Sequence, residues 1–171
     1  MTGLVFVDAN VLLYAVDTRD PAKHHCATEW MARLWRELSG RTGIQVLNEF
    51  YANATQVLDP SLTTHEAWGH VVALMDWNPQ PVDSDVLALG YQIQTRYKLS
   101  WWDSLVVAAA NKQACALLLT EDLQHSAVYA GVTVQNPFRS GVQDMAGVYA
   151  AQICPAPRRG RGRPRTRTVP A

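Results

Sequence analysis

Four acidic residues are spaced along the chain so that folding could bring their carboxylates together: Asp8, Glu49, Asp103 and Asp122. Three of them come within three residues of the end of a short apolar run, and such a run predicts a buried strand. In a parallel sheet the carboxyl ends of all strands lie at one edge, where open α/β sheets place their sites. The fourth, Asp103, opens a fully apolar helix whose amino end can approach the same edge.

Carboxylates gathered in this way favour the binding of a metal ion. Four of them in one cleft repel one another unless a cation binds among them. Hard divalent cations with oxygen ligands, Mg²⁺ or Mn²⁺, meet this requirement. Zinc is disfavoured because no cysteine lies near these acids and His125 is the only nearby histidine. The sequence therefore predicts a Mg²⁺ or Mn²⁺ site.

Each acid also has an ordinary structural explanation. Asp8 could cap the helix after its strand, and Glu49 could favour the first turn of a helix through the helix dipole. Asp103 could be the fourth residue of a capping box that begins at Ser100, and Asp122 could be a turn residue. Taken singly, these explanations compete well with a metal site. Taken together they are weaker, because all four acids would have to reach one sheet edge by chance.

The secondary structure that must position these acids alternates between strands and helices. Strands are predicted over Leu4–Val7, Ile44–Leu47 and Ala116–Leu119, with a late edge strand over Val132–Val134 and a brief one at Pro81–Val82. Helices are predicted over about 11–14, 22–38, 48–58, 64–77, 84–97 and 101–110. This alternation predicts an α/β protein whose parallel sheet carries helices on both faces.

The net charge of zero conceals two oppositely charged parts. Six of the fifteen Lys and Arg residues, and no acid, lie from position 158 onward: Arg158, Arg159, Arg161, Arg163, Arg165 and Arg167. Residues 1–157 therefore carry nine basic against fifteen acidic residues, a charge of −6. From about Ala151 the chain is rich in Pro, Arg, Gly and Thr, a composition that predicts disorder. We expect a folded domain over residues 1–150 and a disordered basic tail over 151–171.

The arginines of this tail are candidate nucleic-acid contacts. The segment Arg161-Gly162-Arg163-Pro164 resembles an AT-hook, an element that lies in the minor groove of A·T-rich DNA. A generic basic tail that adds solubility or binds phosphate nonspecifically is the interpretation we favour. A third option is that the tail folds back over the acidic cleft.

The start of the chain gives no sign of export. Asp8 interrupts the first apolar run and no basic segment precedes it, so a signal peptide is not expected. No apolar stretch reaches the roughly 18 residues that a membrane span requires. We therefore expect a cytoplasmic protein without membrane association.

Four segments resemble, in the expected order, the motifs of the PIN-domain nucleases. They are Val-Asp-Ala-Asn at 7–10, Val-Leu-Asn-Glu-Phe at 46–50, Trp-Trp-Asp-Ser-Leu-Val-Val-Ala-Ala-Ala at 101–110 and Leu-Leu-Thr-Glu-Asp-Leu-Gln-His at 118–125. The closer likeness is to the VapC-type toxins of bacterial type II toxin–antitoxin modules, which Asn136-Pro137-Phe138 also resembles. One departure is Ser104, where the motif commonly has alanine. The likeness spans residues 1–138.

This resemblance implies a three-layer α/β/α sandwich and an endoribonuclease that depends on Mg²⁺ or Mn²⁺. Carried over by position, the catalytic acids are Asp8, Glu49, Asp103 and Asp122. Of these, Asp8, Asp103 and Asp122 would hold the metal, while Asn10 and Thr120 match supporting polar positions. The resemblance also implies an RNA substrate, a cognate antitoxin and a homodimer. The Trp- and Leu-rich helix over 22–38 would serve either as a partner surface or as part of the core.

Two other functions remain open at this stage. One is a noncatalytic nucleic-acid-binding module that keeps the fold and binds through its arginine tail; the four intact acids disfavour it. The other is a DNA-directed nuclease of the same fold, to which only the AT-hook-like segment points.

Overall fold

The computed structural model describes residues 3–139. Its elements are β1 (Val5–Val7), α1 (Ala9–Tyr14), α2 (Pro21–Glu37), β2 (Gly40–Arg41), α3 (Ile44–Gln56), α4 (Thr64–Leu74), a 3₁₀ turn η1 (Met75–Trp77), α5 (Ser84–Tyr97), α6 (Trp101–Lys112), β3 (Leu117–Leu119), β4 (Val128–Tyr129) and β5 (Val132–Gln135). The predicted tail over 151–171, with its six arginines, lies outside the described residues.

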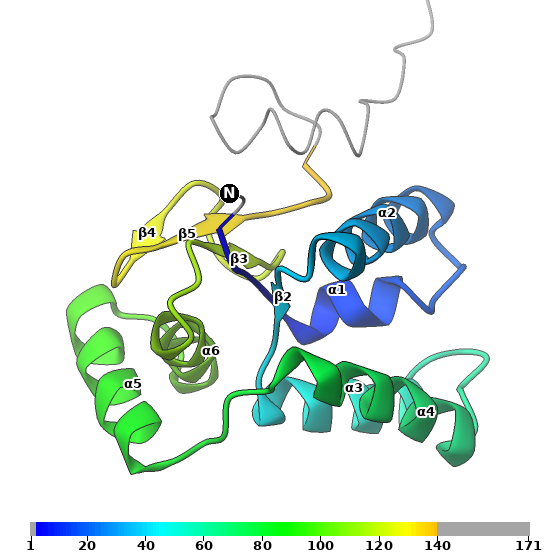
Figure 1. The fold of residues 1–171 in the computed structure, drawn as a ribbon, viewed down its shortest axis with the longest axis horizontal. Coiled ribbons are helices and arrows are strands. Elements are labelled where there is room, and N and C mark those ends of the chain that lie inside the picture. The colour runs from blue at the N-terminus through cyan, green and yellow to red at the C-terminus, as the bar shows by residue number, and fades with distance from the viewer. Residues whose placement is uncertain (1–2, 140–171) are drawn as a thin grey trace, which may run out of the picture.

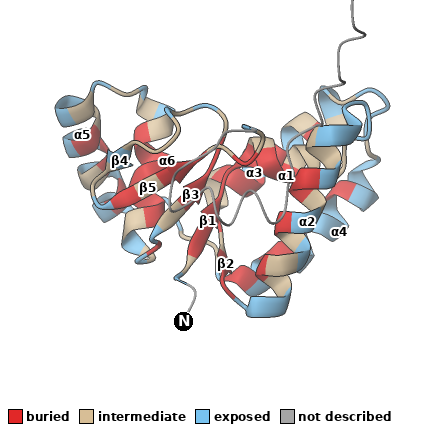
Figure 2. Ribbon diagram, turned by 90° about the horizontal axis from the view of Figure 1, so that it is seen from above, coloured by how far each residue is buried: buried red, intermediate tan, exposed pale blue. Residues whose placement is uncertain are grey.

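A single five-stranded sheet organises these elements, in the order β2-β1-β3-β5-β4. β1 pairs in parallel with both β2 and β3, and β3 pairs in parallel with β5. Within the described chain, β4 alone runs antiparallel to its neighbour. Helices α1 to α4 lie on one side of the sheet and α5 and α6 on the other (Figures 1 and 2). This arrangement confirms the predicted α/β/α sandwich with a mostly parallel sheet.

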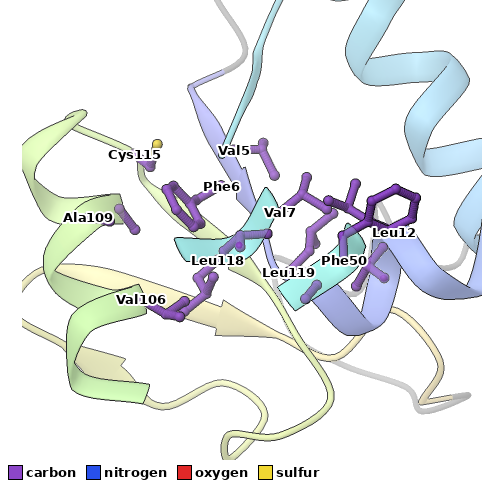
Figure 3. Packing of buried hydrophobic residues seen from close by; sticks show 14 of the residues in the cluster. Val5, Phe6, Val7, Leu12, Phe50, Val106, Ala109, Cys115, Leu118 and Leu119 are labelled. Atoms are coloured by element: carbon purple, nitrogen blue, oxygen red, sulfur yellow. The ribbon is translucent and has the colours of Figure 1, made fainter. Parts of the chain in front are cut away.

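The short central strands contribute buried side chains to the core on both faces of the sheet. Phe6 and Val7 are completely buried. Because successive strand residues point to opposite faces, Phe6 lies on the side of Ala109 in α6, whereas Val7 lies on the side of Leu12 and Phe50 (Figure 3). A three-residue strand therefore fixes helices on both of its faces, and with them the residue that follows it.

Polar caps begin the helices where the sequence predicts them. Asp20 caps α2 ahead of Pro21, and Ser100 caps α6. Thr63 and Glu66 form a reciprocal capping box at the start of α4. These caps confirm the starts of the three helices.

The strand predicted over Ile44–Leu47 is wrong, because these residues form the first turn of α3. The strand at this place is the two-residue β2, which ends at Arg41. The buried residues of α3 recur at helical spacing and are Val46, Leu47, Phe50 and Ala54. A window of four residues cannot show this period, so the run resembled a strand. In consequence Glu49 lies in the second turn of a helix and not directly after a strand.

The end of the sheet also differs from the prediction. β5 is internal, between β3 and β4, and not the edge strand expected over Val132–Val134. β4 takes the edge position and turns into β5 through Ala130 and Gly131, whose φ angles are 49° and 81°. Two positive φ angles match the tight turn preferred in hairpins. The brief strand expected at Pro81–Val82 is reduced to a single bridge between Gly43 and Gln80.

Strands and helices do not alternate throughout, because α3, α4, α5 and α6 follow one another between β2 and β3.

The long helix α2 belongs to the core, since Trp30 and Leu34 are only 2% and 1% exposed. Cys26 and Cys115 are buried as expected. Among the helices within residues 3–139, none combines the length and apolar character needed to cross a membrane.

Candidate functional site

Asp8 lies at the carboxyl end of β1 and caps α1. Its Oδ1 accepts a hydrogen bond from the backbone N–H of Ala9 at 2.8 Å. Its own backbone N–H donates to the carbonyl oxygen of Leu119 at 3.1 Å, which ties the residue to β3. The capping explanation for Asp8 is therefore correct, and it leaves the second oxygen, Oδ2, to face other side chains. The residue is only 6% exposed.

Polar side chains from the ends of β1 and β3 converge on this oxygen. Thr120 Oγ1 donates to Oδ2 of Asp8 at 2.8 Å, and Asn10 Nδ2 lies 3.4 Å from the same atom. Asn10 Nδ2 also donates to Thr120 Oγ1 at 3.0 Å and to Asp122 Oδ2 at 2.9 Å. The backbone N–H of Asp122 donates to Thr120 Oγ1 at 3.2 Å. These four residues, which we call the Asp8 network, are joined because β1 and β3 are adjacent strands.

Burial and neighbouring acids disfavour the ionised form of Asp8. The pKa of Asp8 is raised from 3.8 to about 7, chiefly by burial of its carboxyl group. The charges of Glu49 and Asp122 also act to raise this pKa, whereas hydrogen bonds from Thr120 and from the backbone of Ala9 act to lower it. A cation bound here would offset the charge and favour the ionised form of Asp8.

Glu49 approaches the network from α3. It is close enough for its charge to act on Asp8, although the strand expected before it is absent. Its Oε1 accepts a hydrogen bond from Gln45 Nε2 at 3.1 Å. The same Nε2 lies 3.4 Å from the backbone carbonyl oxygen of Trp102 at the start of α6. Gln45 therefore links the helix that carries Glu49 to the helix that carries Asp103.

Asp103 lies in the first turn of α6, where the sequence places it. Ser100 Oγ donates to Asp103 Oδ2 at 2.6 Å and accepts from the Asp103 backbone N–H at 3.1 Å. These contacts cap α6, although the Asp103 carboxylate binds the Ser100 hydroxyl and not the Ser100 backbone N–H that a capping box uses. Within residues 3–139, no three Asp, Glu, His or Cys side chains lie close enough together to hold a metal ion. The structure thus brings Asp8 and Asp122 together, adds Glu49 through its charge, and leaves Asp103 on its capping contacts.

The donor atoms of the Asp8 network nevertheless fit a hard divalent cation. Asp8 and Asp122 supply carboxylate oxygens. Asn10 Oδ1 is buried and has no hydrogen-bond partner among the described residues, so a neighbouring cation would satisfy it. Ligand sets made only of oxygen suit Mg²⁺ or Mn²⁺.

Two further features of the site escape sequence reasoning. Gln45 precedes Glu49 by four residues, a helical contact that is recognisable only once the start of α3 is placed correctly. Lys23 Nζ lies 2.6 Å from Glu121 Oε2 and holds the loop before Asp122 against α2. These two residues are 98 positions apart, and no local pattern indicates their pairing.

Comparison with known proteins identifies the family. The PIN domain profile matches residues 5–131. The chain therefore belongs to the PIN domain family, as the resemblance of its four motifs predicted. None of the curated proteins matches it in sequence.

Solved structures share the fold at low sequence identity. FitAB bound to an IR36 DNA fragment aligns with a TM-score of 0.64 and 17% identity over 82% of this chain and 100% of that chain. VapBC2 from Rickettsia felis, bound to a DNA fragment from its promoter, gives 0.54 and 11% over 77% and 97%. Mycobacterium tuberculosis VapC20, a sarcin-ricin loop cleaving toxin, gives 0.52 and 19% over 69% and 89%. At these identities the likenesses show that the three structures share the fold of this chain.

Proposed function

We propose that this protein is a Mg²⁺- or Mn²⁺-dependent endoribonuclease that acts as the toxin of a type II toxin–antitoxin module. The observation that carries the proposal is the Asp8 network at the adjacent ends of β1 and β3 in a chain of the PIN domain family. The fold is shared with VapC20, a sarcin-ricin loop cleaving toxin, which supports RNA as the substrate.

The reaction is hydrolysis of an RNA phosphodiester bond. Asp8 and Asp122, joined by Asp103, would hold the metal ion directly or through water. Such an ion would supply a water molecule of lowered pKa and would offset charge that develops on the phosphate. Asn10 and Thr120 orient the carboxylates by hydrogen bonding, and Glu49 orients the attacking water or completes the ligand set.

The proposal extends to partners and location. The toxin would be held inactive by a cognate antitoxin, would form a homodimer and would act in the cytoplasm. VapBC2 and FitAB are toxin–antitoxin complexes bound to DNA, and each contains a chain with the fold of this protein. This likeness supports an antitoxin as the protein partner. The six arginines of the tail would add attraction for nucleic acid.

Cleavage assays on the full-length protein test the function directly. We expect RNA to be cut in Mg²⁺ or Mn²⁺ and to remain intact in EDTA, because in the proposed reaction the ion lowers the pKa of the attacking water. DNA of the same sequence is the control, and equal cleavage of DNA would favour the DNA-directed alternative. A noncatalytic binding module would bind RNA without any requirement for a divalent cation. Intact RNA at every metal concentration would therefore contradict the proposal.

The hydroxyl group of Thr120 gives a second test. Thr120→Val keeps the shape of a fully buried side chain but removes the donor to Asp8 and the acceptor for Asn10. We expect the free energy of unfolding to fall by about 1–3 kcal/mol and RNA cleavage to fall by roughly 10- to 100-fold. Initial rates and thermal unfolding measure the two effects, and Thr120→Ser, which retains the hydroxyl, is the matched control. A valine variant with the wild-type rate would show that Thr120 does not position the acids.

A further inference from the structure

A groove opens between α3 and the start of α6, next to the Asp8 network. Its volume is about 510 Å³, and it is lined by Gln45, Asn48, Glu49, Val82, Trp102 and Leu105. Glu49 connects the groove to the network, because its charge acts on Asp8. Trp102 stands directly before Asp103 in the chain. A strand that presents a phosphate to the acids therefore has a neighbouring nucleotide within reach of this groove.

Trp102 exposes most of its large apolar side chain. Trp102 is 63% exposed, whereas α6 is buried continuously from Ser104 to Ala110. The core therefore does not use this indole ring. Its backbone is held by the contact between the Trp102 carbonyl and Gln45, which fixes the first turn of α6 against α3. An aromatic ring fixed at its base and open to solvent at its face is suited to stacking.

The charge of the groove indicates which part of a nucleotide it would receive. None of its six lining residues is a lysine or an arginine, and Glu49 adds a negative charge. A phosphate group would be repelled here, but an uncharged base would not. The exposed Asn48 amide can donate or accept a hydrogen bond, and the Glu49 carboxylate can accept one from a base N–H group. Apolar walls with polar groups at one side thus complement a nucleobase.

Resting on the proposed nuclease function, we propose that Trp102 is a stacking platform for an unpaired nucleobase of the substrate strand, in the groove formed with Asn48, Glu49 and Val82. Stacking is available only to bases that have left a duplex. The groove therefore makes the enzyme select single-stranded RNA or loops. It also supplies affinity without positive charge, which matters because residues 1–157 carry a net charge of −6.

Binding measurements separate this role from catalysis. The parent protein is the full-length Asp8→Asn variant in Mg²⁺ buffer, and the probes are fluorescein-labelled single-stranded oligoadenylate and oligouridylate. We expect Trp102→Ala in this background to weaken oligoadenylate binding by roughly 5- to 150-fold, the range that corresponds to one stacked base. Trp102→Phe should keep most of the affinity. The preference for oligoadenylate over oligouridylate should shrink in the alanine variant, because purines stack more strongly.

The chain offers a matched control in Trp68, a tryptophan of α4 that is 52% exposed and lies outside the groove lining. Trp68→Ala should bind both RNA probes as the parent does. Equal binding of oligoadenylate by the parent and Trp102→Ala, or no binding of either probe by the parent, would overturn the stacking role. If Trp102→Ala instead weakened only the binding of a synthetic peptide of alternating Leu and Arg, the groove would belong to a protein segment, which also overturns it.

The outcome is distinguishable from that of the proposed function. If the wild-type protein cuts no RNA but Trp102→Ala still loses affinity for oligoadenylate, the nuclease proposal fails and the stacking platform stands. If the wild-type protein cuts RNA and Trp102→Ala binds and cuts equally well, the nuclease proposal stands and the stacking platform fails.

Discussion

Replacing Asp8 by asparagine is expected to lower RNA cleavage by roughly 10³-fold or more, as when a group that acts at the reacting centre is removed. Asparagine can still accept the hydrogen bond from the backbone N–H of Ala9, so the cap of α1 is kept. What is lost is the negative charge of Oδ2, the atom that Thr120 and Asn10 approach. Initial cleavage rates in Mn²⁺, measured at equal protein concentration, give the ratio.

The matched control for this substitution is Asp20→Asn. Asp20 caps α2 as Asp8 caps α1, with its side chain accepting from the backbone N–H groups of Ala22 and Lys23, but it takes no part in the Asp8 network. The Asp20 variant should cut RNA at the wild-type rate. If Asp8→Asn and Asp20→Asn had the same activity, Asp8 would be only a helix cap and the proposed site would be wrong.

Asp103→Asn is expected to abolish cleavage in the same assay. If Asp103 is a metal ligand, binding of the ion has to draw its carboxylate away from the 2.6 Å contact with Ser100 Oγ. The alternative is that Asp103 serves only the N-terminal cap of α6 through its contacts with Ser100, in which case the asparagine variant keeps its activity. This substitution decides between the two explanations that the sequence leaves open for Asp103.

The spatial meeting of Asp8 and Asp122, which the sequence predicts and the structure contains, follows directly from two strand ends. Asp8 and Asp122 come one and three residues after β1 and β3, and these strands are adjacent. Their meeting therefore needs only the correct strands and a parallel sheet. The sequence predicts Glu49 at the same sheet edge only because it predicts a strand over Ile44–Leu47, and the structure has a helix there. Glu49 reaches the site through the second turn of α3, a position that depends on how α3 packs and not on local sequence.

The errors in the predicted fold come from elements too short to show a period. β2 and β4 have two residues each, and two residues show neither alternation nor helical spacing. β2 exists because Gly40 and Arg41 pair with Val5 and Phe6, and β4 exists because the turn at Ala130 and Gly131 folds it back on β5. Such strands are set by their neighbours in the sheet.

Contacts between distant segments account for the remaining features. Gln45 lines the groove beside Trp102 and links α3 to α6, and Lys23 holds the loop before Asp122. The sequence shows each of these residues but not their partners. The sequence does show that residues 1–157 carry a net charge of −6 and that six arginines follow them. An uncharged stacking contact would help the proposed nuclease because its acidic part repels a polyanionic substrate.

The stability of the metal-free protein is expected to fall as the pH rises from about 4 to about 7. In the unfolded chain Asp8 has its ordinary pKa of 3.8, whereas in the folded chain burial raises the pKa to about 7. Between these values the folded protein holds a proton that the unfolded chain has lost, so raising the pH favours unfolding. The full cost, reached above pH 7, is on the order of 4 kcal/mol. In EDTA, this would lower the melting temperature by on the order of 10 °C.

The Asp8→Asn variant isolates this contribution, because asparagine has no charge to bury. In EDTA at pH 8 it should melt at a higher temperature than the wild-type protein, and at pH 4 the two should melt alike. Mn²⁺ at pH 8 should raise the melting temperature of the wild-type protein, since a ligand that binds only the folded state stabilises it, and should leave the variant nearly unchanged. Parallel melting curves for the two proteins across this pH range would show that the Asp8 carboxylate is already compensated without a cation. The loss of cleavage in the variant would then not be linked to relief of a buried charge. If Asp8→Asn both melts at a higher temperature in EDTA and fails to cut RNA, the buried Asp8 carboxylate destabilises the metal-free protein and also binds the ion needed for cleavage.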